Sequence, residues 1–385
     1  MDPRPGHRVA MLDWLACAAR GATEPAARAA RAAGDGLLDR VAFAGTAGHV
    51  LDFDDTYLPG LAHLSAPTAP AALVLAAALD RSIGDALAAY TDGFEAMGAF
   101  AAASHPALYE RGWHPTAVCG SLGAAVAAVR LLGLDTEHER TARALALLRA
   151  AGTRAGFGSD GKALGVGMAA ATGVQAARLA QAGAEMPIER AVNGPAGLGE
   201  AFGGAYAEPA PGAERAVAGN WIKAYPCCLQ THGPIEAAAR APADVVATGT
   251  VDVVVSPVSR RAAPYDDAET PLQAKFSIPY TTAFTLLHGP PTVDAFAALE
   301  PAARALARER VRVKTEPALA ESEAVLRLEG RDVAHVTAAL GSPERPMDSA
   351  QLQAKVRELA GERLDGILDE PQRPAAEVLA AAGLA

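Results

Sequence analysis

The chain has 385 residues, of which 50% are hydrophobic, 5% aromatic and 20% charged. This length predicts two or three domains and is ample for a buried core, and the low charge excludes a disordered chain. The formal net charge of −10 argues against a nucleic-acid-binding protein, which normally carries a basic patch. It also provides no general attraction for anionic ligands, so a binding site for an anion must be built locally.

The sequence has no feature typical of a membrane or secreted protein. No segment reaches the roughly 20 apolar residues that span a bilayer, and the longest candidate, residues 67–79, is shorter. Residues 1–8 are polar, and no apolar signal region follows them. The four cysteines show neither a CxxC motif nor the Cys/His spacing of a zinc site. We therefore expect a cytoplasmic protein with no membrane partner, no disulfide scaffold and no structural zinc.

The N-terminal part of the chain follows a helical period. Apolar residues at positions 9, 12, 15, 16 and 19 form a first amphipathic stripe. Residues 69–79 are apolar nearly all round, which is typical of a buried helix. Alanine is abundant in these segments and favours close-packed helices, because it loses no side-chain entropy on helix formation. Further helices are predicted over residues 85–103, 116–132, 137–150 and 167–182.

The pattern changes near residue 242. Strands are predicted over residues 251–255 and 311–314, and a hairpin over residues 325–336. Helices are predicted over residues 279–287, 293–299 and 349–359, the last with Ser349 as its N-cap. The chain is thus predicted to be mainly α: a large all-helical domain, residues 1–241 rejoined by residues 345–385, and a smaller α+β domain, residues 242–344.

Polar residues interrupt the apolar sequence in five clusters, and these are the candidate functional segments. The first contains three carboxylates within four residues, Asp52, Asp54 and Asp55, which repel one another unless they cap helices, bind cations or differ in pKa. His49 and Asp52 would share one face of a helix. Asp54 and Asp55 could serve as helix caps, or the cluster could bind Mg²⁺, and both alternatives stay open at this stage.

The second and third clusters lie beside predicted helix starts. His114 precedes an alanine-rich helix, where an N-terminus favours anions, although a structural role is the alternative. Residues 156–162 have the glycine spacing of a phosphate loop, but Ala163 replaces the required hydroxyl and no strand precedes the loop. The pattern therefore argues against a nucleotide site, and Lys162 could instead bind a carboxylate.

The fourth and fifth clusters lie further along the chain. The vicinal Cys227 and Cys228 with His232 nearby could form a thiolate nucleophile, or they could be small buried apolar residues. Tyr280 follows a proline at the start of a predicted helix and could supply a phenol as a donor or an acid.

Taken in this order, the clusters resemble the MmgE/PrpD family, whose members include 2-methylcitrate dehydratases, cis-aconitate decarboxylases and iminodisuccinate epimerases. Residues 49–56 are similar to its DFDDT signature, residues 112–118 to its G-[FW]-H-P-T motif and residues 8–16 to its first helix. Residues 341–347, with Lys355 later, are similar to its closing segment. The resemblance covers nearly the whole chain. It implies a helical domain with an α+β lid, a homodimer, and a cofactor-free site in the cleft between the domains.

The resemblance also implies which residues line that site. The chain departs from the family pattern at Tyr57 and Gly165, where histidines are usual, and it is short for the family. Cys228 stands where decarboxylase members are expected to carry a histidine. The implied catalytic residues are Asp52, Thr56, His63, Lys162 and Tyr280, and the implied substrate-binding residues are His114, Lys223, Cys228 and His232.

The chemistry implied by the resemblance is removal of a proton or CO₂ next to a carboxylate, for which lysines would stabilise an enolate-like intermediate and a histidine would move the proton. The first hypothesis is a lyase, foremost a hydro-lyase, acting on a small di- or tricarboxylate without metal, nucleotide or flavin. The departures leave three alternatives: an epimerase or isomerase with two opposed bases, a decarboxylase of the cis-aconitate type, and a non-catalytic helical dimer.

Overall fold

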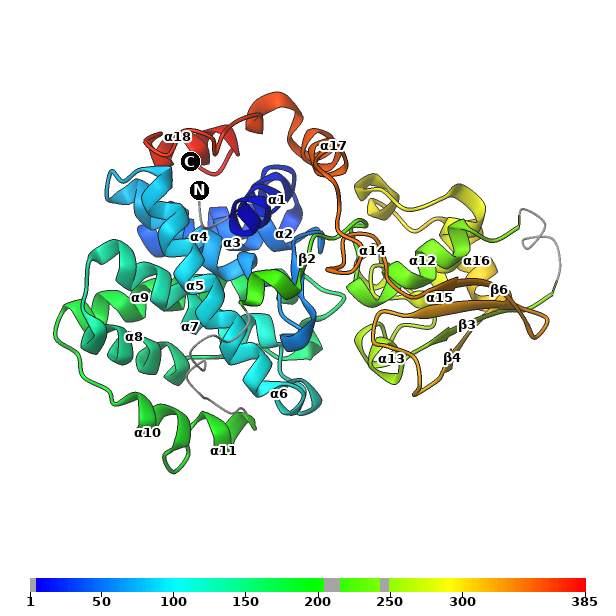
Figure 1. Ribbon diagram of the computed structural model, residues 1–385, viewed down its shortest axis with the longest axis horizontal. Coiled ribbons are helices and arrows are strands. Elements are labelled where there is room, and N and C mark those ends of the chain that lie inside the picture. The colour runs from blue at the N-terminus through cyan, green and yellow to red at the C-terminus, as the bar shows by residue number, and fades with distance from the viewer. Residues whose placement is uncertain (1–4, 204–214, 243–248) are drawn as a thin grey trace.

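The computed structural model of the protein describes residues 5–203, 215–242 and 249–385. Two domains lie side by side in it (Figure 1): a large helical domain and a smaller domain built around a β-sheet. The prediction of a mainly α protein with a smaller α+β part is confirmed.

The large domain is a close-packed set of helices. α7 lies at its centre and packs against α4, α5, α8 and α9, while α3 packs against α9 and α1. Short 3₁₀ helices span Leu58–Gly60, Arg154–Gly156 and Ala216–Gly219. The helices are α1 (Pro5–Gly21), α2 (Pro25–Ala32), α3 (Leu37–His49), α4 (Ser65–Ala78), α5 (Ile83–Ser104), α6 (Ala107–Glu110), α7 (Pro115–Leu132), α8 (Thr136–Leu148), α9 (Gly161–Gln181), α10 (Ile188–Asn193) and α11 (Leu198–Phe202).

Capping interactions set where these helices begin. The Ser82 hydroxyl accepts from the backbone N–H of Asp85, and the Asp85 carboxylate accepts from the backbone N–H of Ser82. This capping box starts α5 before Asp85, where the helix was expected to begin. α9 begins at Gly161 rather than at the expected residue 167, which places Lys162 in its first turn.

α7 corresponds to the helix predicted over residues 116–132. Among the described residues it is the one helix that is long and apolar enough to cross a membrane by length and composition, and it is longer than the apolar stretch at residues 67–79. However, 89% of α7 is buried inside the protein. It therefore serves as the core helix of the large domain.

The smaller domain contains a four-stranded sheet of β3 (Val251–Val255), β4 (Val311–Thr315), β5 (Ala324–Leu328) and β6 (Arg331–Val336), in the order β4-β3-β5-β6. β3 runs parallel to β4 and antiparallel to β5, and Val253 pairs with Val313 and Leu326 in this register. The helices of this domain are α12 (His232–Ala239), α13 (Pro257–Ala262), α14 (Pro271–Ala274), α15 (Ile278–His288) and α16 (Pro301–Arg310), with 3₁₀ helices at Leu229–Thr231 and Val293–Phe296.

The predicted strands and hairpin of this domain are present. Glu329 and Gly330 form a two-residue turn with φ of 49° and 81°, the left-handed geometry that joins tightly twisted strands. The helix predicted over residues 293–299 is only a 3₁₀ turn at Val293–Phe296.

The chain enters the smaller domain earlier than expected and then returns. α12 packs against β5, β6 and α15, so the crossover precedes α12 instead of following residue 241. After the sheet, α17 (Ser349–Ala360) packs on α1, and α18 (Ala375–Ala381) packs on α4, with the 3₁₀ helix Gly361–Leu364 between them. The N-cap of α17 is Asp348, not Ser349, because the Asp348 carboxylate accepts from the backbone N–H of Gln351.

Candidate active site

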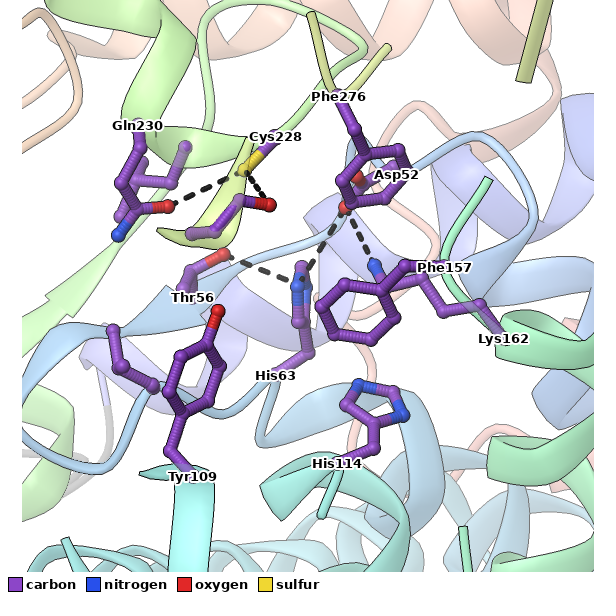
Figure 2. A pocket seen from close by; sticks show the side chains of 13 residues that line it. Asp52, Thr56, His63, Tyr109, His114, Phe157, Lys162, Cys228, Gln230 and Phe276 are labelled. Carbon is purple, nitrogen blue, oxygen red and sulfur yellow. Dashed lines mark hydrogen bonds and ion pairs between the residues drawn. The ribbon is translucent and has the colours of Figure 1, made fainter. Parts of the chain in front are cut away.

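A small cavity of about 50 Å³ lies where the two domains meet (Figure 2). The large domain lines it with Asp52, Thr56, Leu61, His63, Tyr109, His114, Phe157 and Lys162, and the segment that follows the crossover adds Cys228, Leu229, Gln230, Ala262 and Phe276. Most of the predicted site residues therefore meet in one place, although long stretches of chain separate them.

Asp52 is the electrostatic centre of this cavity. Its Oδ1 lies 2.9 Å from Nζ of Lys162 and 2.9 Å from Nζ of Lys223. Burial opposes ionisation of Asp52, but the positive charges of the two lysines outweigh this effect and hold its pKa well below the usual value. Because two ammonium groups share one carboxylate, this group of three carries a net positive charge.

The backbone at Asp52 is unusual. α3 ends at His49, and Asp52 has a left-handed φ of 53°, so the expectation that His49 and Asp52 share a helix face is wrong. Three consecutive carbonyl oxygens, those of residues 51, 52 and 53, accept hydrogen bonds from Nζ of Lys275, Lys223 and Lys355 respectively. These bonds hold the loop in a conformation that a non-glycine residue rarely adopts.

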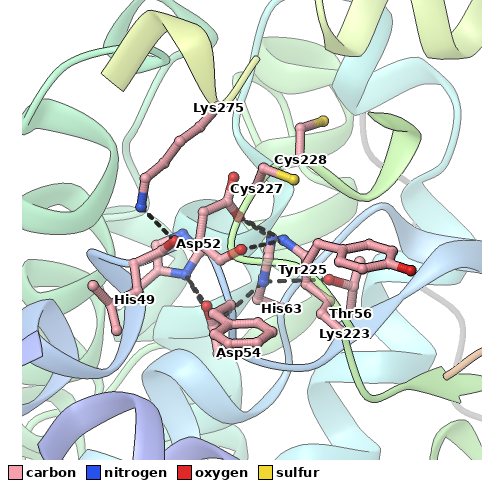
Figure 3. Close-up of polar contacts among 12 residues, drawn as sticks. His49, Asp52, Asp54, Thr56, His63, Lys223, Tyr225, Cys227, Cys228 and Lys275 are labelled. Atoms are coloured by element: carbon pink, nitrogen blue, oxygen red, sulfur yellow. Dashed lines mark hydrogen bonds and ion pairs between the residues drawn. The ribbon is translucent and has the colours of Figure 1, made fainter. Parts of the chain in front are cut away.

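Asp54 lies between two buried histidines (Figure 3). Its Oδ2 is 2.9 Å from Nδ1 of His49 and 3.2 Å from Nδ1 of His63. We assign the Nδ1 hydrogen of His63 from its carboxylate neighbour, which leaves Nε2 as the basic nitrogen, 3.6 Å from Oδ1 of Asp52. Thr56, in β1 (Thr56–Tyr57), has its hydroxyl 3.4 Å from Nδ1 of His63.

Two imidazoles face the cavity in the neutral form. Burial lowers the pKa of His63 to about 4, with a further decrease from the positive charge of Lys162. Burial and Lys162 also hold the pKa of His114, the N-cap residue of α7, well below its usual value. Both rings are therefore neutral near neutral pH, and each keeps one unprotonated nitrogen.

Asp55 behaves differently from its two acidic neighbours. Its carboxylate accepts from the backbone N–H of Ser65, in the first turn of α4, and from the side chain of Asn220 in β2 (Asn220–Trp221), which pairs with β1. Asp55 thus contacts the first turn of α4 without being its N-cap residue, which is Leu64, and Asp54 binds histidines, so neither is the helix cap that the sequence allowed. Burial and the negative charge of Asp54 raise the pKa of Asp55 to about 8.

The structure does not bring Tyr280 and His232 to the cavity wall. The Tyr280 hydroxyl accepts from the backbone N–H of Glu300, at 2.9 Å, and its ring packs in the apolar core of the smaller domain. Nε2 of His232 lies 3.1 Å from the carbonyl oxygen of Tyr225, and burial lowers the His232 pKa to about 3. Lys223 contacts the site through Asp52 without lining the cavity.

Cys228 lines the cavity, but it is not an activated nucleophile. Its thiol donates to the side-chain oxygen of Gln230 at 3.4 Å. Burial raises the pKa of Cys228 to about 11 and that of Cys227 to about 12. Both thiols are therefore protonated near neutral pH, which favours their interpretation as small buried side chains.

Several residues of the site are not among the site residues predicted from the sequence. Tyr109 lies on the single-turn α6, Gln230 in a 3₁₀ turn, and Phe157 and Phe276 flank Nζ of Lys162, with ring centroids at 5.6 and 5.3 Å. None belongs to a periodic pattern that would separate it from ordinary core or loop residues. Lys275 and Lys355 lay in segments of interest, but their backbone contacts depend on the tertiary structure.

Among the described residues, one group of side chains offers atoms spaced for a metal ion. Ligand atoms of His49, Asp54 and His63 lie within 4.8 Å of one another. Hydrogen bonds already join these atoms to each other. Burial and the positive charge of Lys162 lower the pKa values of both histidines, and the same positive charge opposes a cation there.

The helical domain thus meets the α+β domain over a cavity that is lined by a lysine, two histidines and a carboxylate. The chain belongs to the MmgE/PrpD family: the model of the family's N-terminal domain matches residues 37–208, and that of its C-terminal domain matches residues 225–380. The gap between the two matches agrees with a crossover before α12.

Two curated relatives are similar to parts of this chain. Cis-aconitate decarboxylase from Homo sapiens is 34% identical over 209 residues, which cover 51% of this chain and 42% of the relative. Cis-aconitate decarboxylase from Mus musculus is 31% identical over 279 residues, covering 66% of this chain and 55% of the relative. The chain thus spans about half the length of these relatives.

Proposed function

We propose that this protein is a lyase that removes CO₂ from a small polycarboxylate of the aconitate type. One observation carries the proposal: a lysine ammonium group, Lys162, and a neutral imidazole, His63, line the same buried cavity. Family membership and the names of the curated relatives support it. Decarboxylation therefore replaces dehydration as the first hypothesis.

In this proposal Lys162 binds a substrate carboxylate. Asp52 stays paired with Lys223 when Lys162 turns to the substrate, because the two lysines share its Oδ1. The aromatic rings beside Lys162 keep water away and strengthen its attraction to an anion. When the C–CO₂ bond breaks, the electron pair stays on carbon and delocalises towards a neighbouring carboxylate, where a lysine charge stabilises it.

His63 would supply the proton that completes the reaction. A polyanionic substrate beside it raises its pKa from about 4, so the imidazole takes up a proton as the substrate binds. Transfer of this proton from Nε2 to carbon replaces the C–CO₂ bond by a C–H bond. Each turnover therefore releases one CO₂ and consumes one proton from solvent.

The test is a substrate screen in D₂O followed by proton NMR. Incubation with cis-aconitate should give a decarboxylated product that carries one deuterium at the protonated carbon. Lys162→Ala and His63→Ala should abolish the signal while remaining folded. A wild-type protein that leaves cis-aconitate intact but dehydrates citrate or 2-methylcitrate would overturn the proposal and favour the hydro-lyase hypothesis.

One observation favours a second candidate, an epimerase of a dicarboxylate. His63 and His114 are both neutral and both line the cavity, and epimerisation uses two bases, one to remove a proton and one to return it. The same screen separates this candidate. Iminodisuccinate, or another chiral dicarboxylate, would then take up deuterium at its stereocentre without releasing CO₂ or water.

A further inference from the structure

The end of the cavity remote from Lys162 contains a buried hydroxyl group whose hydrogen has no acceptor. Tyr109 is 5% exposed, and the guanidinium of Arg154 lies near its Oη but can only donate, so no group among the residues that the structure describes accepts the Tyr109 hydrogen. Figure 2 shows Tyr109 and Gln230 on one side of His63 and Lys162 on the other, with the Tyr109 hydroxyl directed into the cavity. A buried hydroxyl without an acceptor is unfavourable, so this arrangement suits a bound ligand.

The groups at this end are hydrogen-bond donors. Burial raises the pKa of Tyr109 to about 12, so the phenol keeps its hydrogen near neutral pH. The side-chain oxygen of Gln230 accepts from the Cys228 thiol, an orientation that leaves the amide N–H groups for a ligand. In the described part of the chain, no hydrogen bond from that amide nitrogen to the protein is observed.

Positive charge lies behind these donors. The guanidinium of Arg154 stacks on the Tyr109 ring, 4.1 Å from its centroid, and its buried Nε has no hydrogen-bond partner among the described residues. The carboxylates of the site, Asp52 and Asp54, surround His63 and contact the lysine and the histidines instead. Neutral donors backed by a guanidinium favour an anion over a neutral hydroxyl group.

We propose that Tyr109 and Gln230 form a second carboxylate-binding end of the cavity, which holds the substrate carboxylate farthest from the one that Lys162 binds. This inference rests on the proposed function and narrows it to substrates with carboxylates at two ends. A monocarboxylate occupies only the Lys162 end. The phenol hydroxyl of Tyr109 and the amide of Gln230 then select the substrate by the position of its second carboxylate. They do so as neutral donors, without a further charged group in the cavity wall.

The test is binding of tricarballylate, a saturated tricarboxylate, compared with butyrate, which has one carboxylate. NMR titration gives a Kd for each. Tyr109→Phe should weaken tricarballylate binding about tenfold or more, the usual effect of losing a hydrogen bond to a charged group, and leave butyrate binding unchanged. Tyr225→Phe is the matched control, because that tyrosine does not line the cavity, and it should bind both probes like the wild type.

Two further variants separate the outcomes. Gln230→Glu places a negative charge at the same end and should also weaken tricarballylate selectively, so the inference stays testable if Tyr109→Phe folds poorly. Equal weakening of both probes by these variants, or an unchanged Kd for tricarballylate, would overturn the inference. If the wild type binds neither probe, and Lys162→Ala behaves like the wild type, the proposed function itself fails.

Discussion

At the scale of single residues, Lys162 has both a structural contact and a proposed catalytic role. It pairs with Asp52 and lines the cavity. Lys162→Met should lower kcat/KM by about 10²–10³, the usual effect of removing one group that stabilises charge in the transition state. The fold should persist, because Asp52 retains Lys223. Steady-state kinetics and thermal unfolding check this, and a large loss of stability with full activity per folded molecule would contradict it.

Asp54 is expected to act through His63 as a positioning residue. Asp54→Asn should reduce kcat by about 10²–10⁴ with little effect on KM, because Asp54 does not line the cavity. Its negative charge raises the pKa of His63, so its removal lowers that pKa. The basic limb of the kcat profile, where protonated His63 loses its proton, should therefore move to lower pH.

Kinetics of Asp54→Asn across pH, compared with the wild type, test this assignment. A merely structural role would reduce the amount of folded protein without moving the basic limb. An unchanged profile with reduced activity would therefore remove Asp54 from the positioning role and leave it as a buried partner of His49.

Two tyrosines mark how far the sequence could predict the site. The resemblance, which rests on the order of the motifs, implied that Asp52, Thr56 and Lys162 line one site, and the structure places all three in one cavity. It also suggested Tyr280, whose hydroxyl is instead used by the backbone of Glu300, a contact that no local pattern reveals. Tyr109 could not be found, because it lies on a single helical turn without a motif, and only the tertiary structure directs it into the cavity.

At the scale of elements, the close approach of α3 and α9 positions the lysine. A Cβ at Gly167 would collide with the backbone oxygen of Ala42 and the hydroxyl of Thr46, whereas a Cβ at Gly165 meets nothing within 4 Å. Gly167→Ala should destabilise the protein by about 1–3 kcal/mol through overpacking. Gly165→Ala, on the same helix, should stabilise it by about 0.4–1 kcal/mol.

Chemical denaturation of both glycine variants tests this packing. The pair is matched in residue type, helix and helix propensity, so only the space around the new methyl group differs. Equal effects of the two substitutions would contradict a tight α3–α9 contact at Gly167.

Element boundaries show why the sequence predicts segments better than their ends. The apolar period predicted α5, α9 and α17, but each begins at a residue set by capping or tertiary contacts. The helix period also continues through α12, although this helix packs on the sheet. A periodic apolar face indicates burial without indicating the partner that buries it. For this reason the sequence pattern predicts a domain boundary at residue 241, after α12, whereas the crossover precedes this helix.

At the scale of the whole molecule, the cavity limits how the protein can work. A volume of about 50 Å³ holds only a few water molecules. Residues on both sides of the crossover form the walls, so the space available to a substrate depends on how the two domains meet. The loop that carries Asp52 accepts hydrogen bonds from Lys223, Lys275 and Lys355. Lys355 lies on α17, which packs on α1 of the large domain, whereas Lys275 comes from the smaller domain, so both domains hold this loop.

The buried histidines predict how the stability of the molecule depends on pH. Burial lowers the pKa of His63 to about 4 and that of His232 to about 3, and it also lowers the pKa values of His49 and His114. In the unfolded chain each imidazole titrates near 6.5. As the pH falls from about 6.5 to about 4, the unfolded chain therefore takes up protons that the folded protein excludes.

The free energy of unfolding should consequently fall in this range by up to about 1.4 kcal/mol per pH unit for each such histidine. Asp55 opposes the trend, because its pKa of about 8 lets the folded protein keep a proton that the unfolded chain loses above about pH 4. Burial also raises the pKa of Asp13, so two carboxyl groups against four imidazoles still leave a net loss of stability on acidification. Calorimetric Tm values should therefore decrease from about pH 7 to pH 5, and a constant or rising Tm would contradict the neutral, buried state of the histidines around the cavity.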